Sequence, residues 1–434
     1  MKGVSGTDAT TVIGVQNNPG NKQRYDFRGK PNDGNVSVSV IGTAGNMTLT
    51  GNPYPSAIDL NLFLTDISNT PFIDGTALFW EHNPSIASHF LASYQGGYGV
   101  YNGTSSVYTP AVFYAYDGAG NQTGTASTPM NMYQRRFCPV GQGFMLRGTA
   151  PGTVQFKNSY RVFKNEGVAS NSEFHRNSDP GTLADYGNYG NIPNVAGTDY
   201  TLISKAPTPH ININGLLNNQ ALRQVALCFM ADASDGVDLA DSKSPDTNSN
   251  LPFDMYLYLG NSEYINSTTN FDINKRYPLG FKNNVPATFK IKVADFINFE
   301  AVNVYLYDRE SQTYYDIKNS EYELTLPAGV NNSRFEVTFT NGALGLESLS
   351  ADTFDIVQNN NSQKISISNP KLMDLKSVSL YDMGGKLIFN KTDLGSKSNY
   401  QFSTSGISDA VYIVKIVTST NEDFGRKITV HSGK

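Results

Sequence analysis

The run Phe289-Lys290-Ile291-Lys292-Val293 alternates apolar and charged side chains. Because successive side chains of a β-strand point to opposite faces of a sheet, this run predicts a strand with one face on a core. The same alternation recurs at residues 302–306 and 335–339, where Glu336 falls on the solvent face of the pattern. Turn signals such as Asn341-Gly342 separate the runs. Repeated half-buried strands of this kind are typical of β-sandwiches.

The composition of the whole chain favours the same fold class. Its 434 residues include 39 Gly, 25 Tyr and 24 Phe beside 1 Trp. Charged residues make up 16% of the chain, against about 25% in an average soluble domain, so Asn, Ser, Thr, Gly and Tyr must supply the polar surface. We therefore expect an all-β protein built from several sandwich modules, since one domain usually has ~100–200 residues.

Charge and cysteine content exclude several classes of protein. The net charge of -5 gives no general attraction to nucleic acid, and no stretch approaches the roughly 18 apolar residues of a membrane-spanning helix. Cys138 and Cys228 are far apart in sequence, which excludes a multi-cysteine zinc module. They are either two buried free thiols or one bridge in an exported protein.

A single short helix is expected, directly after Gly51-Asn52-Pro53-Tyr54-Pro55. Ser56 stands where an N-cap residue would, and Asp59 follows three residues later. The apolar face of this helix would consist of Ile58, Leu62 and Phe63.

Composition also divides the chain into modules. Residues 165–199 are rich in Gly, Asn, Ser and Asp and read as a long connection, and residues 341–352 read as a linker. We therefore expect a β-rich module at 1–200, a β-sandwich at 201–347 and a compact Ig-like sandwich at 353–434.

The C-terminal module carries the most specific pattern. Short apolar runs at 354–357, 365–367 and 378–381 precede a tight turn at Asp382-Met383-Gly384-Gly385, whose glycines suit a positive φ. The run 411–417 is apolar on both faces, as in a central strand. The order of these elements resembles the type A C-terminal sorting domain of the type IX secretion system. The residues that match its motif are Tyr381, Asp382, Gly384, Gly385, Lys386, Val411, Tyr412, Val414, Lys415, Lys427 and Val430.

Two features depart from that family. Ala410 stands where the family usually has Gly, and four residues, 431–434, follow the usual end. The resemblance implies a folded export signal that is recognised by an outer-membrane translocon and its shuttle proteins. It also implies a secreted, surface-attached protein whose precursor begins with a signal peptide; the start of this sequence has no apolar segment of that kind.

A second resemblance lies upstream of the C-terminal module. The segments 51–59, 78–82 and 141–144, and the stretch from Arg223 to Phe339, look like parts of large bacterial surface proteins of the adhesin type. These families have no assigned chemistry. The resemblance implies surface display and contact with a surface glycan or with another cell.

An acidic loop is the one candidate metal site. Asp232, Asp235, Asp238 and Asp241 recur at three-residue steps around Gly236. A glycine-containing acidic loop can wrap a calcium ion, which prefers oxygen ligands, although this spacing is not that of an EF-hand. The alternative is a solvated loop whose carboxylates cap their own turns. No other cofactor is indicated.

Catalytic motifs are not found. The five histidines, at 82, 89, 175, 210 and 431, are dispersed, and there is no nucleophile elbow or P-loop. Trp80-Glu81-His82 could combine a sugar-stacking ring with an acid, but the favoured interpretation places Trp80 at the end of a core strand and Glu81 in solvent. The chain is therefore expected not to be an enzyme.

Tyrosines crowd one Gly/Ser/Thr-rich stretch of the first module. They are Tyr94, Tyr98, Tyr101, Tyr108, Tyr114 and Tyr116. Exposed aromatic faces suit contacts with sugars or proteins, whereas the alternative is that these rings simply pave a sheet edge. The main hypothesis is thus an exported, non-enzymatic surface protein, and the second is a fragment of a secreted glycan-active enzyme whose catalytic part lies upstream or is unrecognised.

Overall fold

The structure of this protein is a computed structural model. It describes residues 11–12, 15–16, 29–43, 46–83, 86, 88, 90–126, 135–164, 187–247, 251–341, 354–420 and 422–431. Most of the predicted linker at 341–352 and of the predicted connection at 165–199 lies outside these residues, as do His89 and His175.

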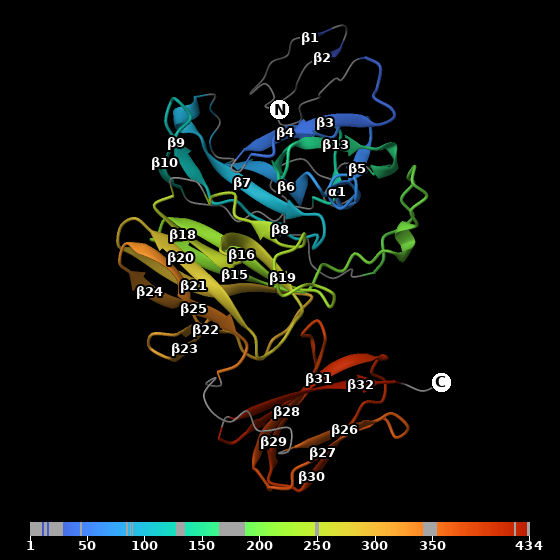
Figure 1. Ribbon diagram of the computed structural model, residues 1–434, viewed down its shortest axis with the longest axis vertical. Coiled ribbons are helices and arrows are strands. Elements are labelled where there is room, and N and C mark those ends of the chain that lie inside the picture. Colours follow the sequence, from blue (N-terminus) through green and yellow to red (C-terminus); the bar gives the residue numbers. More distant parts are fainter. Residues whose placement is uncertain are drawn as a thin grey trace. The chain divides into compact units, whose positions relative to one another are not determined.

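The chain forms two compact units. The first consists of residues 1–206 with 220–223 and 242–252, and the second consists of 207–219, 224–241 and 253–434. Three short segments of the predicted 201–347 module, namely 201–206, 220–223 and 242–252, are therefore part of the first unit. Nearly all regular structure in both units is β, which confirms the all-β sandwich class (Figure 1).

The first unit contains one large sheet and several small ones. The large sheet has the order β10-β9-β7-β6-β12-β4, with β8 beside β7; the small sheets are β11-β5-β14, β13-β3 and β1-β2. The bounds are β1 Thr11–Val12, β2 Val15–Gln16, β3 Val36–Val40, β4 Met47–Gly51, β5 Ala57–Asp59, β6 Ile73–His82, β7 Gln95–Asn102, β8 Tyr108–Thr109, β9 Tyr114–Tyr116, β10 Gln122–Thr125, β11 Phe137–Cys138, β12 Gly143–Gly148, β13 Gly152–Phe156, β14 Arg161–Val162 and β17 Ser242–Lys243. Single 3-10 turns occupy Leu91–Ser93, Asn158–Tyr160 and Tyr200–Leu202.

The core of the first unit fills the space between the large sheet, the β13-β3 pair and helix α1 (Leu60–Leu64). Phe63 of the helix stacks on Phe156 of β13, with ring centroids 4.3 Å apart, and meets Phe144 of β12 edge to face. All three rings are fully buried. This aromatic cluster supplies much of the apolar area that holds the layers together.

The predicted helix exists, but it begins three residues later than expected. Ser56 is not its N-cap: residues 57–59 form β5, which pairs with β11 and β14, and Asp59 caps the helix by accepting a hydrogen bond from the Asn61 backbone N–H at 3.0 Å. Strand pairing on both sides of residues 57–59 therefore outweighed the local helix signal.

The second unit is built on one long sheet of the order β23-β22-β25-β20-β18-β19-β16-β15-β21-β24, in which β16 and β19 are parallel. The bounds are β15 His210–Leu217, β16 Ala221–Phe229, β18 Phe253–Leu259, β19 Ser262–Thr269, β20 Arg276–Asn283, β21 Ala287–Ile297, β22 Tyr305–Asp308, β23 Thr313–Asp316, β24 Tyr322–Leu326 and β25 Gly329–Thr338. Phe281 of β20 meets Phe289 of β21 at 5.0 Å although these strands are distant in the sheet order. The sheet therefore folds over on itself around one core.

The alternating run at residues 289–293 is confirmed as part of strand β21. Phe289, Ile291 and Val293 are buried, and Lys292 is exposed. Glu336 of β25 is different: it is only 4% exposed rather than on a solvent face, because Arg276 and Arg309 both pair with its carboxylate. Alternation places Glu336 on the face opposite Phe335 and Val337, but it does not reveal that Arg276 and Arg309 cover the carboxylate there.

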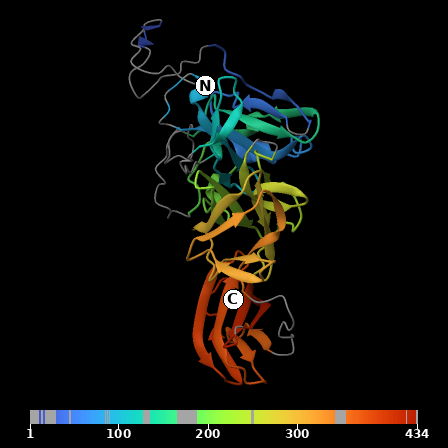
Figure 2. The same ribbon diagram turned by 90° about the vertical axis from the view of Figure 1, so that its left-hand side faces the viewer.

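Residues 354–431 form a seven-strand sandwich of two sheets, β26-β27-β30 and β29-β28-β31-β32, seen from the side in Figure 2. The bounds are β26 Asp355–Asn359, β27 Lys364–Ser368, β28 Leu375–Asp382, β29 Leu387–Gly395, β30 Asn399–Ser403, β31 Ala410–Thr418 and β32 Asp423–Val430. Its core includes Ile365 and Ile367 from one sheet and Leu380 and Val414 from the other. The predicted strand over 411–417 is confirmed as a central strand, β31.

Both cysteines are free and buried, as one of the two interpretations of the sequence held. Burial raises the pKa of Cys138 to about 12 and also raises that of Cys228. Neither thiol is therefore a ready nucleophile. Across the described residues, no helix combines the length and the apolar character needed to cross a membrane.

Candidate functional site

Strand β6 presents Trp80 and Glu81 to opposite sides of the large sheet, as successive residues of a strand must. Glu81 points to the interior and is 0% exposed, whereas Trp80 is half-buried. The expectation that Glu81 faces solvent is therefore wrong, whereas Trp80 does lie near the end of a largely buried strand, β6. The charge of Glu81 suggested a solvent-facing side chain, but its direction depends on which face of the sheet the core covers.

One oxygen of the buried Glu81 carboxyl, Oε1, has hydrogen-bond partners. It accepts a short hydrogen bond from the Tyr108 hydroxyl and a longer one, 3.4 Å, from the Ala111 backbone N–H. Burial raises the pKa of Glu81 to about 7, and the Tyr108 hydrogen bond and the charge of Arg135 oppose that rise. Since the carboxyl is sealed from solvent, it is placed to stabilise the fold rather than to protonate a substrate.

Three half-buried aromatic rings gather on the opposite face of the same sheet. Trp80 of β6 lies directly across from Tyr98 of β7, with ring centroids 5.2 Å apart and planes at 72°. Tyr116 of β9 approaches the same indole to 5.8 Å at 56°. We call Trp80, Tyr98 and Tyr116 the aromatic platform.

Gly96 makes the platform possible. A Cβ at Gly96 would lie 2.8 Å from Cζ2 of Trp80, closer than real Cβ contacts occur, and would also overlap with the Glu81 carbonyl oxygen. The Tyr116 hydroxyl donates to the Gly96 carbonyl at 3.4 Å, so this ring lies over the glycine as well. A side chain at position 96 would fill the space in which the rings meet.

The crowd of tyrosines seen in the sequence divides into two groups. Tyr101, Tyr108 and Tyr114 are buried, and Tyr94, Tyr98 and Tyr116 are half-buried. Tyr114 lies on the same face of β9 as Tyr116 but is buried: its hydroxyl donates a short hydrogen bond to Asp246, which is paired with the fully buried Arg223 at 2.7 Å. Of the six tyrosines, only Tyr94, Tyr98 and Tyr116 are therefore exposed enough to contact a ligand.

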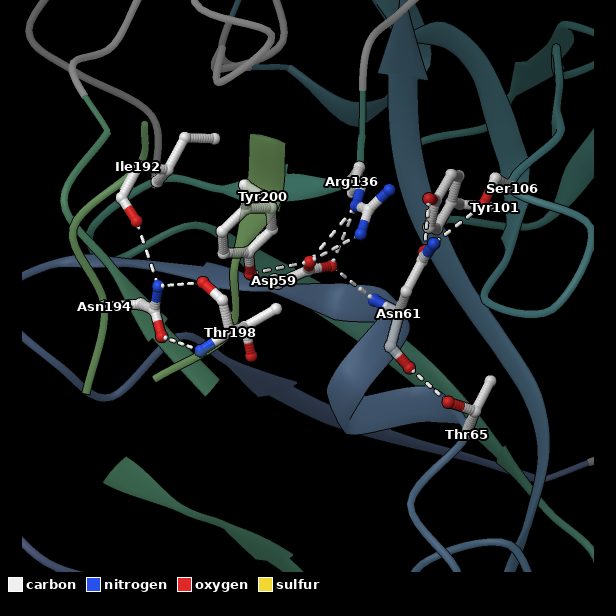
Figure 3. A network of polar contacts seen from close by, with 10 residues as sticks. All are labelled: Asp59, Asn61, Thr65, Tyr101, Ser106, Arg136, Ile192, Asn194, Thr198 and Tyr200. Atoms are coloured by element: carbon white, nitrogen blue, oxygen red, sulfur yellow. Dashed lines mark hydrogen bonds and ion pairs between the residues drawn. The ribbon is translucent and has the colours of Figure 1, made fainter. Parts of the chain in front are cut away.

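A second polar cluster surrounds Asp59 at the start of α1 (Figure 3). Its fully buried carboxylate accepts hydrogen bonds from Arg136 at 3.0 and 3.1 Å and from the Tyr200 hydroxyl at 3.0 Å. The Arg136 guanidinium also lies 5.2 Å from the ring centroid of Tyr189. Because the Asp59 carboxylate is fully buried and its charge is paired with Arg136, we interpret the cluster as a structural lock that joins β5, the residues before β11 and the turn at Tyr200.

The neighbouring side chains extend the lock on both sides. Asn61 donates to the Ser106 hydroxyl at 2.7 Å, and Asn194 closes its own loop by donating to the carbonyls of Ile192 and Thr198 (Figure 3). This loop leads into Tyr200 and so helps to place its hydroxyl against Asp59. The contact between Tyr200 and Asp59 joins residues 141 positions apart, so no local pattern in the sequence predicts it.

The structure does not gather the acidic loop around one point. Asp238 accepts from the Ala240 N–H at 2.8 Å, Asp241 accepts from the Thr268 N–H at 2.8 Å, and Asp235 accepts from Thr269 at 2.9 Å. Asp232 is exposed. Among the residues that the structure describes, no three acidic, His or Cys side chains are grouped as metal ligands. Asp238 thus caps a local turn, whereas Asp235 and Asp241 hold the loop to β19, and the geometry favours these protein contacts over a calcium ion.

The sorting-motif residues lie together in the C-terminal sandwich, on β28, β31, β32 and the turn between β28 and β29. Six of them are buried: Tyr381, Gly385, Tyr412, Val414, Lys415 and Val430. Tyr412, Val414 and Val430 belong to the core of the sandwich, whereas Tyr381 belongs to the core of the preceding sheet. Lys415 pairs with Asp423 at 3.1 Å, and burial lowers the pKa of this ammonium group despite that partner. Lys386, Val411 and Lys427 are exposed, and Gly384 is partly so.

The turn itself follows the chemistry expected from sequence. Asp382 accepts hydrogen bonds from the backbone N–H groups of Gly384 and Lys386, both at 2.9 Å. Gly385 has a φ of +80°, a conformation that side chains disfavour. The motif thus specifies a tight hairpin between β28 and β29.

Comparisons with known proteins add a family but no activity. Two solved structures share 10% identity with this chain: a polysaccharide lyase (TM-score 0.15, covering 56% of this chain and 42% of that one) and a biofilm-associated protein domain (TM-score 0.16, covering 87% and 59%). The chain thus spans about half the length of those proteins, and similarity this low carries no argument about function. No curated protein matches the chain. Residues 344–430 match a second model, described as Domain of unknown function (DUF8694). Residues 9–339 match the model described as Domain of unknown function (DUF8693), and the chain belongs to that family.

Proposed function

We propose that this chain is an exported, non-enzymatic surface protein of the adhesin type, and that residues 353–434 are its export signal. In this proposal an outer-membrane type IX translocon and its shuttle proteins recognise the C-terminal sandwich. The two sandwich-rich segments before it are the cargo displayed outside the cell. The single observation that carries the proposal is that the motif residues quoted from the sequence lie in one folded sandwich.

The exposure of the motif residues supports this assignment. A recognition signal needs some side chains that the fold does not use, and Lys386 and Lys427 fit this description because both are exposed on strand ends or edges. The buried members, such as Tyr412 and Val414, belong to the sandwich core and keep those lysines in place. A folded signal explains why the motif mixes core and surface positions.

The second candidate, a glycan-active enzyme, has less support within the described residues. The acid that sequence reasoning singled out, Glu81, is enclosed by Tyr108 and by backbone. An acid that works on a glycosidic bond must reach the substrate. We therefore propose a binding role for the first unit and no catalysis.

The experiment compares the full chain with a version that ends at residue 352. Both are expressed behind the same signal peptide in a bacterium with a type IX system, and fractionation locates them. We expect the full chain at the cell surface and the shortened chain in the periplasm. Equal surface exposure of the two would overturn the proposed export role.

A further inference from the structure

We propose that the aromatic platform of Trp80, Tyr98 and Tyr116 is a binding site for neutral carbohydrate. The inference deepens the proposed adhesin role by naming the class of ligand, and in that respect it rests on the proposed function. The site lies wholly within the first unit, on strands β6, β7 and β9 of the large sheet.

The orientation of the rings suits a sugar. The face of an aromatic ring is electron-rich, and the C–H groups of a sugar ring carry partial positive charge, so the two attract each other when they lie face to face. Tyr98 meets Trp80 nearly edge-on at 72°, and Tyr116 is tilted by 56°. The rings thus meet at an angle rather than stacking face to face. Tyr116 also packs against the buried cluster around Tyr114, and each of the three rings keeps part of its surface exposed.

The burial of these rings differs from that of the structural aromatic residues. Phe63, Phe144 and Phe156 are at most 1% exposed, as is expected for side chains whose only role is packing. Trp80, Tyr98 and Tyr116 are each half-buried. Since the chain contains 1 Trp, its largest aromatic side chain stands at a partly open position. Trp and Tyr at such positions supply rigid contact area at low entropic cost.

Polar groups on the same face could orient a hydroxyl-rich ligand. Gln122 lies opposite Tyr116 in the β9–β10 register. His82 is exposed two residues after Trp80, on the same side of β6. An amide, an imidazole and two phenol hydroxyls beside aromatic rings are the few polar groups that fix a ligand in a mostly apolar site.

The charge around the platform favours an uncharged ligand. Glu81 points to the opposite side of the sheet and is buried. On the platform's own face, Asp246 accepts from Tyr114 and pairs with the fully buried Arg223 at 2.7 Å, so this pair is neutral as a whole. Asp117, next to Tyr116, accepts hydrogen bonds from N–H groups of its own loop. No Lys or Arg of the described residues lies on β6, β7, β9 or β10. An acidic polysaccharide would find no cation on these strands to pair with its charges, whereas a neutral polysaccharide needs no such partner.

The single Trp makes the test direct, because its emission reports on the platform alone. The purified full chain is titrated with four neutral oligosaccharides, namely cellohexaose, maltohexaose, mannohexaose and fully N-acetylated chitohexaose. Trp80 fluorescence and the heat of binding are recorded. A heparin oligosaccharide serves as the charged comparison. We expect a saturable change with at least one neutral sugar and none with heparin.

Variants identify the site. Tyr98→Leu and Tyr116→Leu keep Trp80 and an apolar side chain but remove one ring face, and each should weaken binding about tenfold, which is about 1.4 kcal/mol. Tyr315→Leu is the matched control, because Tyr315 stacks on Tyr322 at 3.8 Å in the second unit. Melting curves show that each variant is folded. Should Tyr98→Leu not fold, Tyr98→Phe with Tyr116→Leu takes its place.

Absence of any fluorescence change and of any binding heat with all four neutral sugars would overturn the inference. So would binding that the Tyr116→Leu variant retains in full, or heparin binding that matches the neutral sugars. The assay uses purified protein, so a negative result leaves the proposed export untouched. A failure of export in cells would equally leave a positive titration standing.

Discussion

Trp80 and Tyr98 lie directly opposite each other on adjacent antiparallel strands, with their ring centroids 5.2 Å apart. Directly opposed residues share one face of a sheet, so this pairing fixes both rings on the same side. The next residue along β6, Glu81, must then face the interior. One register thus produces both a half-open aromatic surface and a buried acid.

The space over Gly96 should be essential to the platform. Gly96→Ala would place a Cβ against the Trp80 ring and the Glu81 carbonyl oxygen, and relieving that overlap should destabilise the first unit by about 1–3 kcal/mol. Urea unfolding followed by Trp80 emission measures this. Gly118→Ala is the matched control, because nothing lies within 4 Å of its Cβ position. Equal unfolding midpoints for the two variants would refute the packing described for Gly96.

The buried Asp59 should matter more for stability than an exposed carboxylate with a similar partner. Asp59→Asn leaves the Arg136 guanidinium without its counter-charge, and we expect a loss of about 3 kcal/mol in the free energy of unfolding. Asp33→Asn, which breaks the exposed pair with Arg161, should change little. Denaturant unfolding of both variants at one pH gives the comparison; similar midpoints would contradict the lock assigned to Asp59.

Glu81 should make the protein more stable at acidic than at alkaline pH. Burial raises its pKa from an ordinary value of 4.5 to about 7, so between these values the folded state holds a proton that the unfolded state has released. The stabilisation is complete below about pH 4.5 and is lost as the pH rises through 7, a change on the order of 1–3 kcal/mol.

Glu81→Gln removes this titration but keeps a side chain of the same shape. The difference in unfolding free energy between wild type and Glu81→Gln should therefore move in favour of the variant between pH 5 and pH 8. Taking the difference cancels the other titrating groups, such as Asp241, whose pKa burial raises to about 6. A difference that is independent of pH would show that Glu81 titrates normally.

Calcium should leave the melting temperature unchanged. Asp235, Asp238 and Asp241 each accept hydrogen bonds from nearby N–H or O–H groups, which offers an ion no common centre. A site filled at a hundredfold excess over its Kd would add about 2.7 kcal/mol to stability. Melting curves with millimolar Ca²⁺ and with chelator decide this, and a rise that Asp238→Asn abolishes would restore the metal site.

Local patterns were sufficient to predict the β class and individual strands. Alternation at 289–293 located β21, and the glycines at 384–385 located the hairpin turn, because both signals depend on neighbouring residues. The direction in which Trp80 and Glu81 point could not be predicted, since it depends on the register of β6 with β7 and on which face the core covers. The Asp59 lock was missed for the same reason: Asp59, Arg136 and Tyr200 meet only in the folded chain.

The assignment of the C-terminal sandwich is tested most directly by a reporter. Residues 353–434 are fused behind a signal peptide and a fluorescent protein in a bacterium with a type IX system, and surface protease accessibility is measured. We expect the fusion at the cell surface, and reduced export when the exposed Lys386 and Lys427 are both replaced by Ala in a sandwich that still folds. Retention of the unaltered fusion in the periplasm, beside an established sorting domain that is exported, would contradict the central claim.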